Sequence, residues 1–363
     1  MKRERVAICH ASVLERDAIG CDIISQCEVL ESLGFTPEIL CNLAMLEAPR
    51  FTVRTDLQTA SVNSYAFVLY HHSIYWAAGE RVLERCRRPV AIKYHNITPP
   101  EAFRGYSKVV AQACADGREQ TARLARAKYR WLADSPFNQA ELLALGVRPE
   151  RAAVAAPFHL ADRFLDLPKA KPPRPRLLIV GRIVPNKGHL IALRILRELV
   201  YGLRFDCELV IVGKPDLSLF GYLEEIEKTI GESALAAHVG FVKDASAAAF
   251  SEMLSSSSAY LCTSTHEGFC VPVLEAQAAR VPLLVIAGTA AEDTAGPNQL
   301  IVREPRSDAE VRQVAEALRQ LLTDEQRANE AVAAGVANLT RRFSRELIEN
   351  QLVEGLLPIL ETC

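Results

Sequence analysis

Two glutamates stand eight residues apart in the stretch Ser264–Ala276, which reads S-T-H-E-G-F-C-V-P-V-L-E-A. We expect Glu267 on the loop after a strand over Tyr260–Thr263, and Glu275 inside a helix that begins near Pro272, because proline fits the first turn of a helix. This spacing does not make the two carboxylates an adjacent acid/base pair. It predicts that they contact different parts of one long ligand. The alternative for Glu275 is a helix-surface position, although its neighbours in the helix are apolar.

A second stretch, Gly181-Arg-Ile-Val-Pro-Asn-Lys-Gly188, lies between an apolar strand over Leu177–Val180 and an amphipathic helix. Such a loop presents free backbone N–H groups and the positive end of the helix dipole. Arg182 and Lys187 add two cations, and the combination suits a diphosphate. The spacing is neither that of a Walker loop nor that of a G-x-G-x-x-G turn, so a solvated turn is the alternative. Further backbone N–H groups that precede a helix and can face an anion belong to Phe269, Cys270 and Val271.

The elements that must position these residues follow from the hydrophobic pattern. Short apolar runs predict strands at Val6–Cys9, Glu38–Cys41, Phe67–His71, Val90–Tyr94, Trp131–Ala133, Leu177–Val180, Leu209–Val212, Tyr260–Thr263, Leu283–Ile286 and Leu300–Val302. Amphipathic runs predict helices at Ile23–Leu33, Ala77–Cys86, Asn138–Leu145, Leu190–Leu199, Tyr222–Ile230, Ala247–Leu254, Pro272–Ala279 and from Glu310 to about Leu356. Apolar strands that alternate with helices indicate parallel sheets covered on both faces.

A proline-rich segment divides the chain. Residues 166–176 hold four prolines in eleven residues, which neither a helix nor a central strand tolerates. We therefore predict an N-terminal domain over 1–165, a linker over 166–176 and a C-terminal domain over 177–342, with a helix over 343–363 that packs back towards the first domain. Both domains are doubly wound and would face each other across a cleft. Ligands bind such sheets beyond the carboxyl ends of the strands.

Composition excludes several classes of protein. The 363 residues are 49% hydrophobic and 24% charged, with a net charge of −2, which is typical of a globular protein. The N-terminal apolar run is too short for a signal-peptide core, and no run reaches the ~18 residues of a membrane span. The ten cysteines form no C-x-x-C pair, so they resemble buried side chains in a reducing compartment rather than zinc ligands. We expect a cytoplasmic protein.

One segment is strongly basic. Residues 81–130 contain 12 lysines and arginines against 4 acidic residues, which leaves a net charge of −10 on the rest of the chain. A cationic helix face would attract anionic lipid head groups or a lipid-diphosphate acceptor, so membrane association is one alternative. A solvated helix face is the other. No aromatic–basic interleaving accompanies the patch, and nucleic acid is not expected as a partner.

The two stretches together resemble the retaining glycosyltransferases of family 4, which have the GT-B fold. The resemblance covers most of the chain and is strongest from Leu177 to about Val302. Its most specific feature is Glu267-x7-Glu275 within E-G-F-x-x-P-V-L-E-A. The family's usual glycine two places after Gly268 is replaced by Cys270, where a positive φ would be costly. The segments that resemble the family's nucleotide-side strands are Leu209–Gly213 and His238–Phe241.

The resemblance implies a role for each residue of the second half. Glu275 would bind the ribose hydroxyls of a nucleoside-diphosphate sugar, and Glu267 would contact the donor sugar. Arg182 and Lys187 would hold the diphosphate in the loop that Gly181 opens. Lys214, after the next strand, would lie near the base. The residues whose backbone would add hydrogen bonds to sugar and phosphate are Gly268, Phe269, Cys270 and Val271.

The first half resembles the family more loosely. Lys93–Pro100 looks like the family's histidine loop, which implies that His95 faces the donor sugar; a core histidine bonded to backbone is the alternative. The loop Glu15–Asp22 takes the place of a glycine-rich loop, of which only Gly20 remains. Two adjacent histidines, His71 and His72, must point to opposite sides of a strand, so we expect one of them to be structural. Asp134-Ser-Pro136 looks like a helix cap.

The implied reaction transfers a sugar to a glycan or a lipid-linked acceptor with retention of configuration. No D-x-D pair is present, so we expect no metal site and no cofactor besides the nucleotide-sugar donor. A nucleotide-sugar epimerase of the same fold and a nucleotide-sugar-binding module without turnover are the alternatives. A phosphorylase is less well supported, because nothing resembles a pyridoxal-phosphate lysine site.

Overall fold

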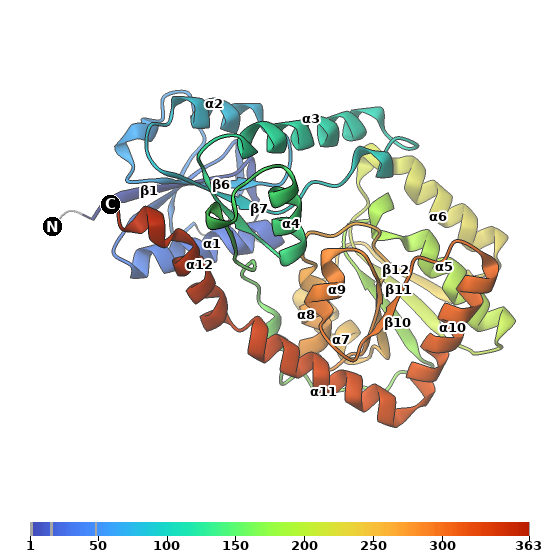
Figure 1. Ribbon diagram of the computed structural model, residues 1–363. Coiled ribbons are helices and arrows are strands. Elements are labelled where there is room, and N and C mark those ends of the chain that lie inside the picture. Colours follow the sequence, from blue (N-terminus) through green and yellow to red (C-terminus); the bar gives the residue numbers. More distant parts are fainter. Residues whose placement is uncertain (1–2, 15–16, 48, 363) are drawn as a thin grey trace. The chain divides into compact units, whose positions relative to one another are not determined.

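The computed structural model describes residues 3–14, 17–47 and 49–362, and its contacts divide these into two units. Unit 1 comprises residues 1–97, 113–160 and 343–363, and unit 2 comprises residues 98–112 and 161–342. Each unit is built around its own parallel sheet (Figure 1). The last helix therefore belongs to the unit that the N-terminal strands form.

Unit 1 is built on a seven-stranded sheet in the order β5-β3-β1-β6-β7-β8-β9. All of its described strand pairs are parallel, and the central strands are buried along their whole length, which explains their unbroken apolar character. Its strands are β1 (Arg5–Cys9), β3 (Thr36–Leu40), β5 (Thr52–Arg54), β6 (Val68–His72), β7 (Val90–Tyr94), β8 (Arg130–Ala133) and β9 (Ala152–Val154). A separate two-stranded sheet pairs β2 (Ser12–Leu14) with β4 (Leu43–Met45).

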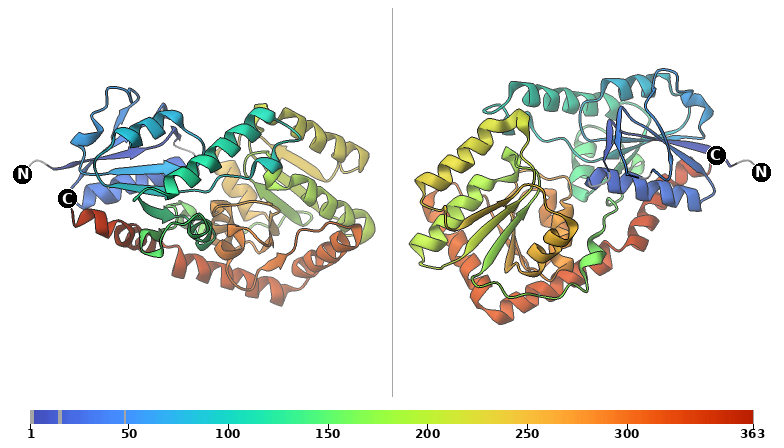
Figure 2. Two further views of the ribbon diagram at one scale, coloured as in Figure 1. Left: turned by 45° about the horizontal axis from the view of Figure 1, so that its top comes forward. Right: turned by 180° about the vertical axis from the view of Figure 1, so that it is seen from behind.

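Helices cover both faces of this sheet (Figures 1 and 2). The helices α1 (Ala18–Ser32) and α12 (Arg345–Leu360) lie on one side, and α2 (Ala77–Arg85) lies on the other with the part of α3 (Lys108–Ala125) that belongs to this unit. The helix α4 (Pro136–Ala144) begins at Ser135, whose hydroxyl accepts from the Asn138 N–H at 3.2 Å. The expected cap after β8 is thus confirmed at Ser135.

Unit 2 holds a six-stranded parallel sheet in the order β12-β11-β10-β13-β14-β15. Its strands are β10 (Arg176–Val180), β11 (Glu208–Val212), β12 (Val239–Val242), β13 (Ala259–Cys262), β14 (Leu283–Ile286) and β15 (Leu300–Val302). Its helices are α5 (His189–Arg197), α6 (Phe220–Glu232), α7 (Ala247–Ser255), α8 (Val271–Ala278), α9 (Ala290–Ala295), α10 (Asp308–Thr323) and α11 (Glu325–Arg342). One core joins β10 and β11 to α5, α6 and α10, with Leu196, Ile211 and Ile226 fully buried.

The helical stretch expected from Glu310 to about Leu356 consists of the three helices α10, α11 and α12. One expectation from the sequence needs correction. Residues 18–22, which we expected in a loop, form the first turn of α1. Gly20 is required there because a Cβ would lie 1.8 Å from the carbonyl oxygen of Leu14, so the helix can approach β2 only without a side chain. Of the other three residues of the expected loop, Asp17 is the N-cap of α1, and Glu15 and Arg16 lie outside the described residues.

Candidate functional site

The two stretches that the sequence singles out meet at one edge of the unit 2 sheet. Strand β10 pairs with β11 on one side and with β13 on the other, so the strand order reverses at β10. Residues 181–188 leave the carboxyl end of β10, and residues 263–270 leave the carboxyl end of β13. Open α/β sheets bind ligands at such a switch point. The topology therefore places both stretches where a ligand is expected.

Direct backbone contact joins the two loops. Gly188 has φ +68°, and a Cβ there would lie 2.0 Å from the carbonyl oxygen of Thr263. Thr265 N–H donates to Asn186 O at 2.8 Å, and the Thr263 hydroxyl donates to Lys187 O at 3.1 Å. Only glycine permits this close approach. The loops form one surface, with the N-terminus of α5 directly behind Gly188.

Lys187 and Glu267 form an ion pair within this surface. The Lys187 Nζ lies 2.6 Å from Glu267 Oε1, and the Ser264 hydroxyl donates to the same oxygen at 2.7 Å. Burial by itself would lower the pKa of Lys187, but the charge and hydrogen bond of Glu267 outweigh it and raise that pKa. Lys187 therefore stays cationic at the site, and its carboxylate partner is held in a fixed position.

Two further cations at the strand ends are exposed. The Arg182 side chain is 75% exposed, and its Nη1 lies 3.7 Å from Asp216 Oδ2. The Lys214 Nζ lies 3.1 Å from Asp244 Oδ1, and both of these side chains are also exposed. Exposed ion pairs contribute about 0–1 kcal/mol, so each cation can leave its partner for an anionic ligand at little cost.

Glu275 is a partly buried carboxylate with one long ion-pair contact. Its side chain is 14% exposed on α8, and the nearest cation is Arg163, whose Nη2 lies 3.7 Å from Oε1. Within the described part of the chain no donor makes a hydrogen bond to this carboxylate. Burial raises the pKa of Glu275 to about 7, and Arg163 offsets this only in part. The side chain is therefore more buried than that of a typical helix-surface glutamate, and its carboxylate can accept hydrogen bonds from ligand hydroxyl groups.

Cys270 occupies a left-handed conformation just before α8. Its φ of +82° and ψ of +71° confirm that the position requires a positive φ, at which a side chain is strained. The Cys270 Sγ lies 3.7 Å from Cys262 Sγ, and both residues are buried. The contact with Cys262 and burial raise the pKa of Cys270, so the thiol is neutral. Phe269 and Val271 flank Cys270 at the N-terminus of the helix, after Gly268, as expected.

His95 follows β7 in unit 1, and both of its ring nitrogens are engaged. Its Nδ1 lies 2.8 Å from Asp134 Oδ2 and its Nε2 lies 2.8 Å from His71 Nδ1. The side chain is 6% exposed. His72 points to the other side of β6, where its Nε2 lies 2.8 Å from Thr121 Oγ1. Sequence reasoning assigned Asp134 only to a helix cap, because nothing local shows that β7 and β8 bring it to His95.

The basic segment uses many of its arginines internally. Arg118 binds Glu141 Oε1 and Ile97 O, Arg123 binds Glu80, and Arg130 donates to Gly355 O at 2.7 Å. Arg85 and Arg88 donate to backbone carbonyls. The exposed cations of the segment are Arg81, Arg85, Arg87, Arg88, Arg104, Lys108, Arg123, Arg126 and Lys128. Among the described helices, none combines the length and the apolar character that crossing a bilayer would require.

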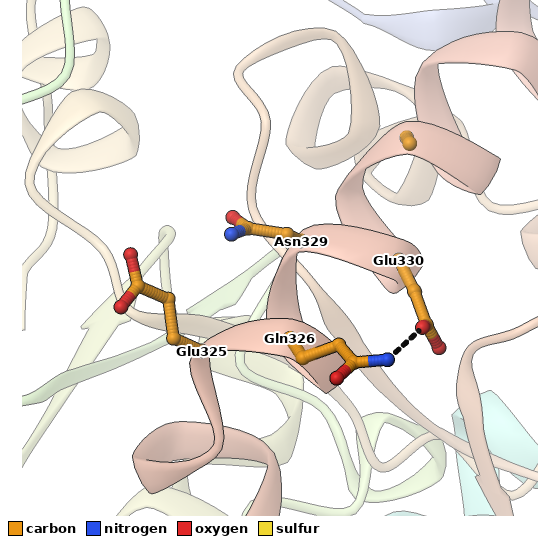
Figure 3. A pocket seen from close by; sticks show the side chains of 5 residues that line it. Glu325, Gln326, Asn329 and Glu330 are labelled. Atoms are coloured by element: carbon orange, nitrogen blue, oxygen red, sulfur yellow. Dashed lines mark hydrogen bonds between the residues drawn. The ribbon is translucent and has the colours of Figure 1, made fainter.

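A surface hollow on α11 is not a second candidate site (Figure 3). Its lining residues all come from that one helix, and Gln326 Nε2 donates to Glu330 Oε1 at 2.9 Å across one turn. The charged groups at the hollow are Glu325 and Glu330, which would repel a phosphate. Among the described residues, no other helix or strand contributes a side chain to this hollow.

The GT-B fold is confirmed by comparison with solved structures. The chain is similar to HepE of Anabaena in complex with UDP and glucose, with 16% identity over 98% of this chain and 100% of that one and a TM-score of 0.76. It is equally similar to sucrose-phosphate synthase of Thermosynechococcus elongatus, with 16% identity over 99% and 100% and a TM-score of 0.76. WaaG, a glycosyltransferase involved in lipopolysaccharide biosynthesis, gives a TM-score of 0.70 at 16% identity over 97% and 99%.

A family model matches the second half of the chain. Residues 166–336 match the family described as glycosyl transferases group 1. The matched region contains the loops after β10 and β13 and all of α8. No curated protein matches the chain by sequence.

Proposed function

We propose that the protein is a retaining glycosyltransferase that moves a sugar from a nucleoside-diphosphate sugar to a glycan or a lipid-linked acceptor. The observation that carries the proposal is Glu275, a partly buried carboxylate without a hydrogen-bond donor among the described residues, on the helix that follows the switch-point loop. Vicinal hydroxyl groups of a ribose would supply the missing donors. HepE, in its complex with UDP and glucose, provides an example of this fold with such a ligand.

The other residues of the site take roles along the donor. Arg182 and Lys187 would hold the diphosphate, with Gly181 and Gly188 bringing the backbone close. Glu267, fixed by Lys187 and the Ser264 hydroxyl, would contact hydroxyl groups of the sugar. Lys214 would lie towards the base. Backbone groups of residues 268–271 would complete the cradle.

The proposed reaction requires stabilisation of a leaving phosphate. The bond between the anomeric carbon and the phosphate oxygen breaks, the acceptor oxygen bonds to that carbon, and the departing phosphate takes the acceptor proton. Arg182, Lys187 and the N-terminus of α5 would stabilise the negative charge that grows on the phosphate. We propose that these groups suffice without a metal ion.

We also propose that the basic segment over residues 81–130 contacts the membrane that carries the acceptor. A lipid-linked acceptor would fit a protein that touches an anionic membrane surface through the exposed cations of residues 81–130. The exposed cations of the segment that belong to unit 1 are Arg81, Arg85, Arg87, Arg88, Arg123, Arg126 and Lys128. Binding to vesicles with and without anionic lipid tests this contact, since it must weaken as salt rises.

A donor screen tests the proposed activity. Thermal stability is measured with UDP-, GDP- and ADP-sugars, because a ligand at 100 times its Kd stabilises a protein by about 2.7 kcal/mol. The stabilising donor is then incubated with glycan and lipid-linked acceptors and the product is analysed. Sugar transfer with retained configuration supports the proposal. An epimerised or eliminated sugar without acceptor indicates an epimerase, and binding without turnover indicates a binding module.

A further inference from the structure

A chain of four hydrogen bonds runs through the core of unit 1 to His95. Asp22 Oδ2 lies 2.9 Å from Gln26 Nε2, and Gln26 Oε1 lies 3.0 Å from His71 Nε2. His71 Nδ1 lies 2.8 Å from His95 Nε2, and His95 Nδ1 lies 2.8 Å from Asp134 Oδ2. All except His95 are buried. The two rings stack, with centroids 5.0 Å apart and planes 24° from parallel.

The number of titratable protons in this hydrogen-bond network follows from the number of its hydrogen bonds. Each bond needs one hydrogen, and the Gln26 amide can donate in only one direction while its oxygen accepts in the other. If the amide donates to Asp22, the remaining three bonds need three hydrogens from the histidines and Asp134. If the amide is turned round, Asp22 must itself be protonated, and three titratable protons are again required. Two neutral imidazoles supply two, so the chain holds one proton more.

The extra proton makes the cluster electrically neutral. With three protons, the two carboxyl groups and two imidazoles carry a net charge of −1. Lys93 is fully buried, and its Nζ lies 2.7 Å from Asp134 Oδ1 and donates to Ala155 O. With the ammonium group of Lys93 included, the net formal charge of the five residues is zero. Burial favours a cluster without net charge.

The surroundings of the cluster fit this charge distribution. Burial opposes ionisation of Asp134, yet His95 and Lys93 hold its pKa below the usual range. Burial raises the pKa of Asp22 and lowers that of His71. The Phe158 N–H donates to Asp22 Oδ1 at 2.9 Å. From the end of β1, His10 faces His71 with ring centroids 6.2 Å apart, and burial lowers the pKa of His10 to about 4, so it stays neutral.

We propose that His71, Asp134 and Lys93 are positioning residues for His95. They fix the orientation of its ring in a hydrogen-bond network of zero net charge. Because both ring nitrogens are occupied in this network, His95 transfers no proton to a substrate. Neither ring nitrogen is directed to solvent, because each is bonded inside unit 1. The N···N distance of 2.8 Å is that of a hydrogen bond with one proton between the rings, and it is shorter than two nitrogens at ~2.0–2.1 Å from a tetrahedral Zn²⁺ would allow.

The network is tested first without reference to activity. Proton and nitrogen NMR of the full chain, with histidine labelled by ¹⁵N, should show strongly downfield ring N–H resonances and a nitrogen pair that shares one proton. His71→Gln and Asp134→Asn should each remove one of these resonances. His72→Gln is the matched control, because it removes a neighbouring buried imidazole that bonds Thr121 instead, and it should leave them unchanged. The proposal would be overturned if neither His71 Nδ1 nor His95 Nε2 carried a proton. One bound metal ion per polypeptide in the purified protein would also overturn it.

The second test separates positioning from proton transfer, and it depends on the proposed glycosyl transfer. Asparagine at position 95 can still donate to Asp134 but cannot carry a proton in catalysis. His95→Asn should therefore retain a large part of the kcat that His95→Ala loses, with no new limb in the pH profile. If both variants lose roughly 10²–10⁴ in kcat at unchanged donor Kd, His95 moves a proton and the proposal is wrong. If the wild-type chain turns over no donor, the proposed function fails, while the NMR result still decides the network.

Discussion

Lys187 and Glu267 lie 80 residues apart in the sequence, and a 2.6 Å ion pair joins them where β10 and β13 end. One member comes from the loop that suits a diphosphate, and the other from the loop that the glutamate motif marks. The ion pair therefore couples the loop after β10 to the loop after β13. A phosphate that attracts Lys187 also weakens the electrostatic interaction of Glu267 with this lysine.

Replacing Glu275 by alanine should weaken donor binding. The carboxylate would lose charge-assisted hydrogen bonds to ribose hydroxyl groups, which contribute roughly 1.5–3 kcal/mol. Calorimetric titration of donor into the variant should show a Kd raised about tenfold or more. Glu227→Ala, at an exposed position on α6, is the control. An unchanged Kd in Glu275→Ala would remove the residue from the site.

The stability of the ligand-free protein should depend on Glu275 between about pH 4.5 and pH 7. The pKa of Glu275 is raised to about 7 from its usual 4.5, so the unfolded state releases this proton first. The protonated carboxyl makes its full contribution to the free energy of unfolding below pH 4.5, the pKa in the unfolded state. This contribution is lost as the pH rises through the folded-state pKa of about 7. Glu275→Gln should abolish this loss, so its advantage in urea denaturation should grow from pH 5 to pH 8. A constant difference across that range would show that the pKa of Glu275 is not raised by burial.

Alanine at Arg182 or at Lys187 should lower kcat far more than it raises the donor KM. The negative charge on the leaving phosphate is larger in the transition state than in the bound donor, so each cation stabilises the transition state more. By analogy with a deleted oxyanion donor we expect losses on the order of 10²–10³ in kcat. Arg312→Ala, which removes an exposed ion-paired arginine of the same unit, should leave steady-state kinetics unchanged. A variant with wild-type kcat and only a raised KM would show that its residue merely holds the ground state.

Transfer activity should survive chelation. The candidate site offers two cations and a helix N-terminus to the diphosphate, and the chain contains no D-x-D pair. Product formation in EDTA should equal that in untreated enzyme. Loss of transfer that Mg²⁺ or Mn²⁺ restores would replace this mechanism by a metal-dependent one.

Glycine should be better tolerated than alanine at position 270. At φ +82° any side chain is strained by about 1–2 kcal/mol, and Cys270 offsets this strain by packing its sulfur against Cys262. Cys270→Ala keeps the strain and loses the sulfur contact, whereas Cys270→Gly loses both. Urea denaturation should therefore find Cys270→Gly more stable than Cys270→Ala by roughly 1 kcal/mol. The reverse order would mean that the backbone adopts another conformation here.

The sequence by itself determined the local elements of the protein. The predicted strands Val90–Tyr94 and Leu283–Ile286 coincide with β7 and β14, because an apolar run that must be buried on both faces is a property of neighbouring residues. The loops after Val180 and Cys262 were recognised for the same reason, since glycine and proline act on the backbone where they stand. The motif also marked Cys270 as the position where a positive φ would be costly, and the structure has φ +82° there.

Only the tertiary structure decided how the charged groups are paired and buried. Glu275 appears in the sequence as one glutamate of a helix, and its raised pKa arises because the surrounding fold removes water and brings no donor to it. Asp134 was expected only as part of a helix-capping segment, yet the adjacency of β7 and β8 brings it to His95 and Lys93. Hydrophobic periodicity is local and can be followed along a chain, whereas the field at a charged group depends on strand order and on which distant residues share its low-dielectric surroundings.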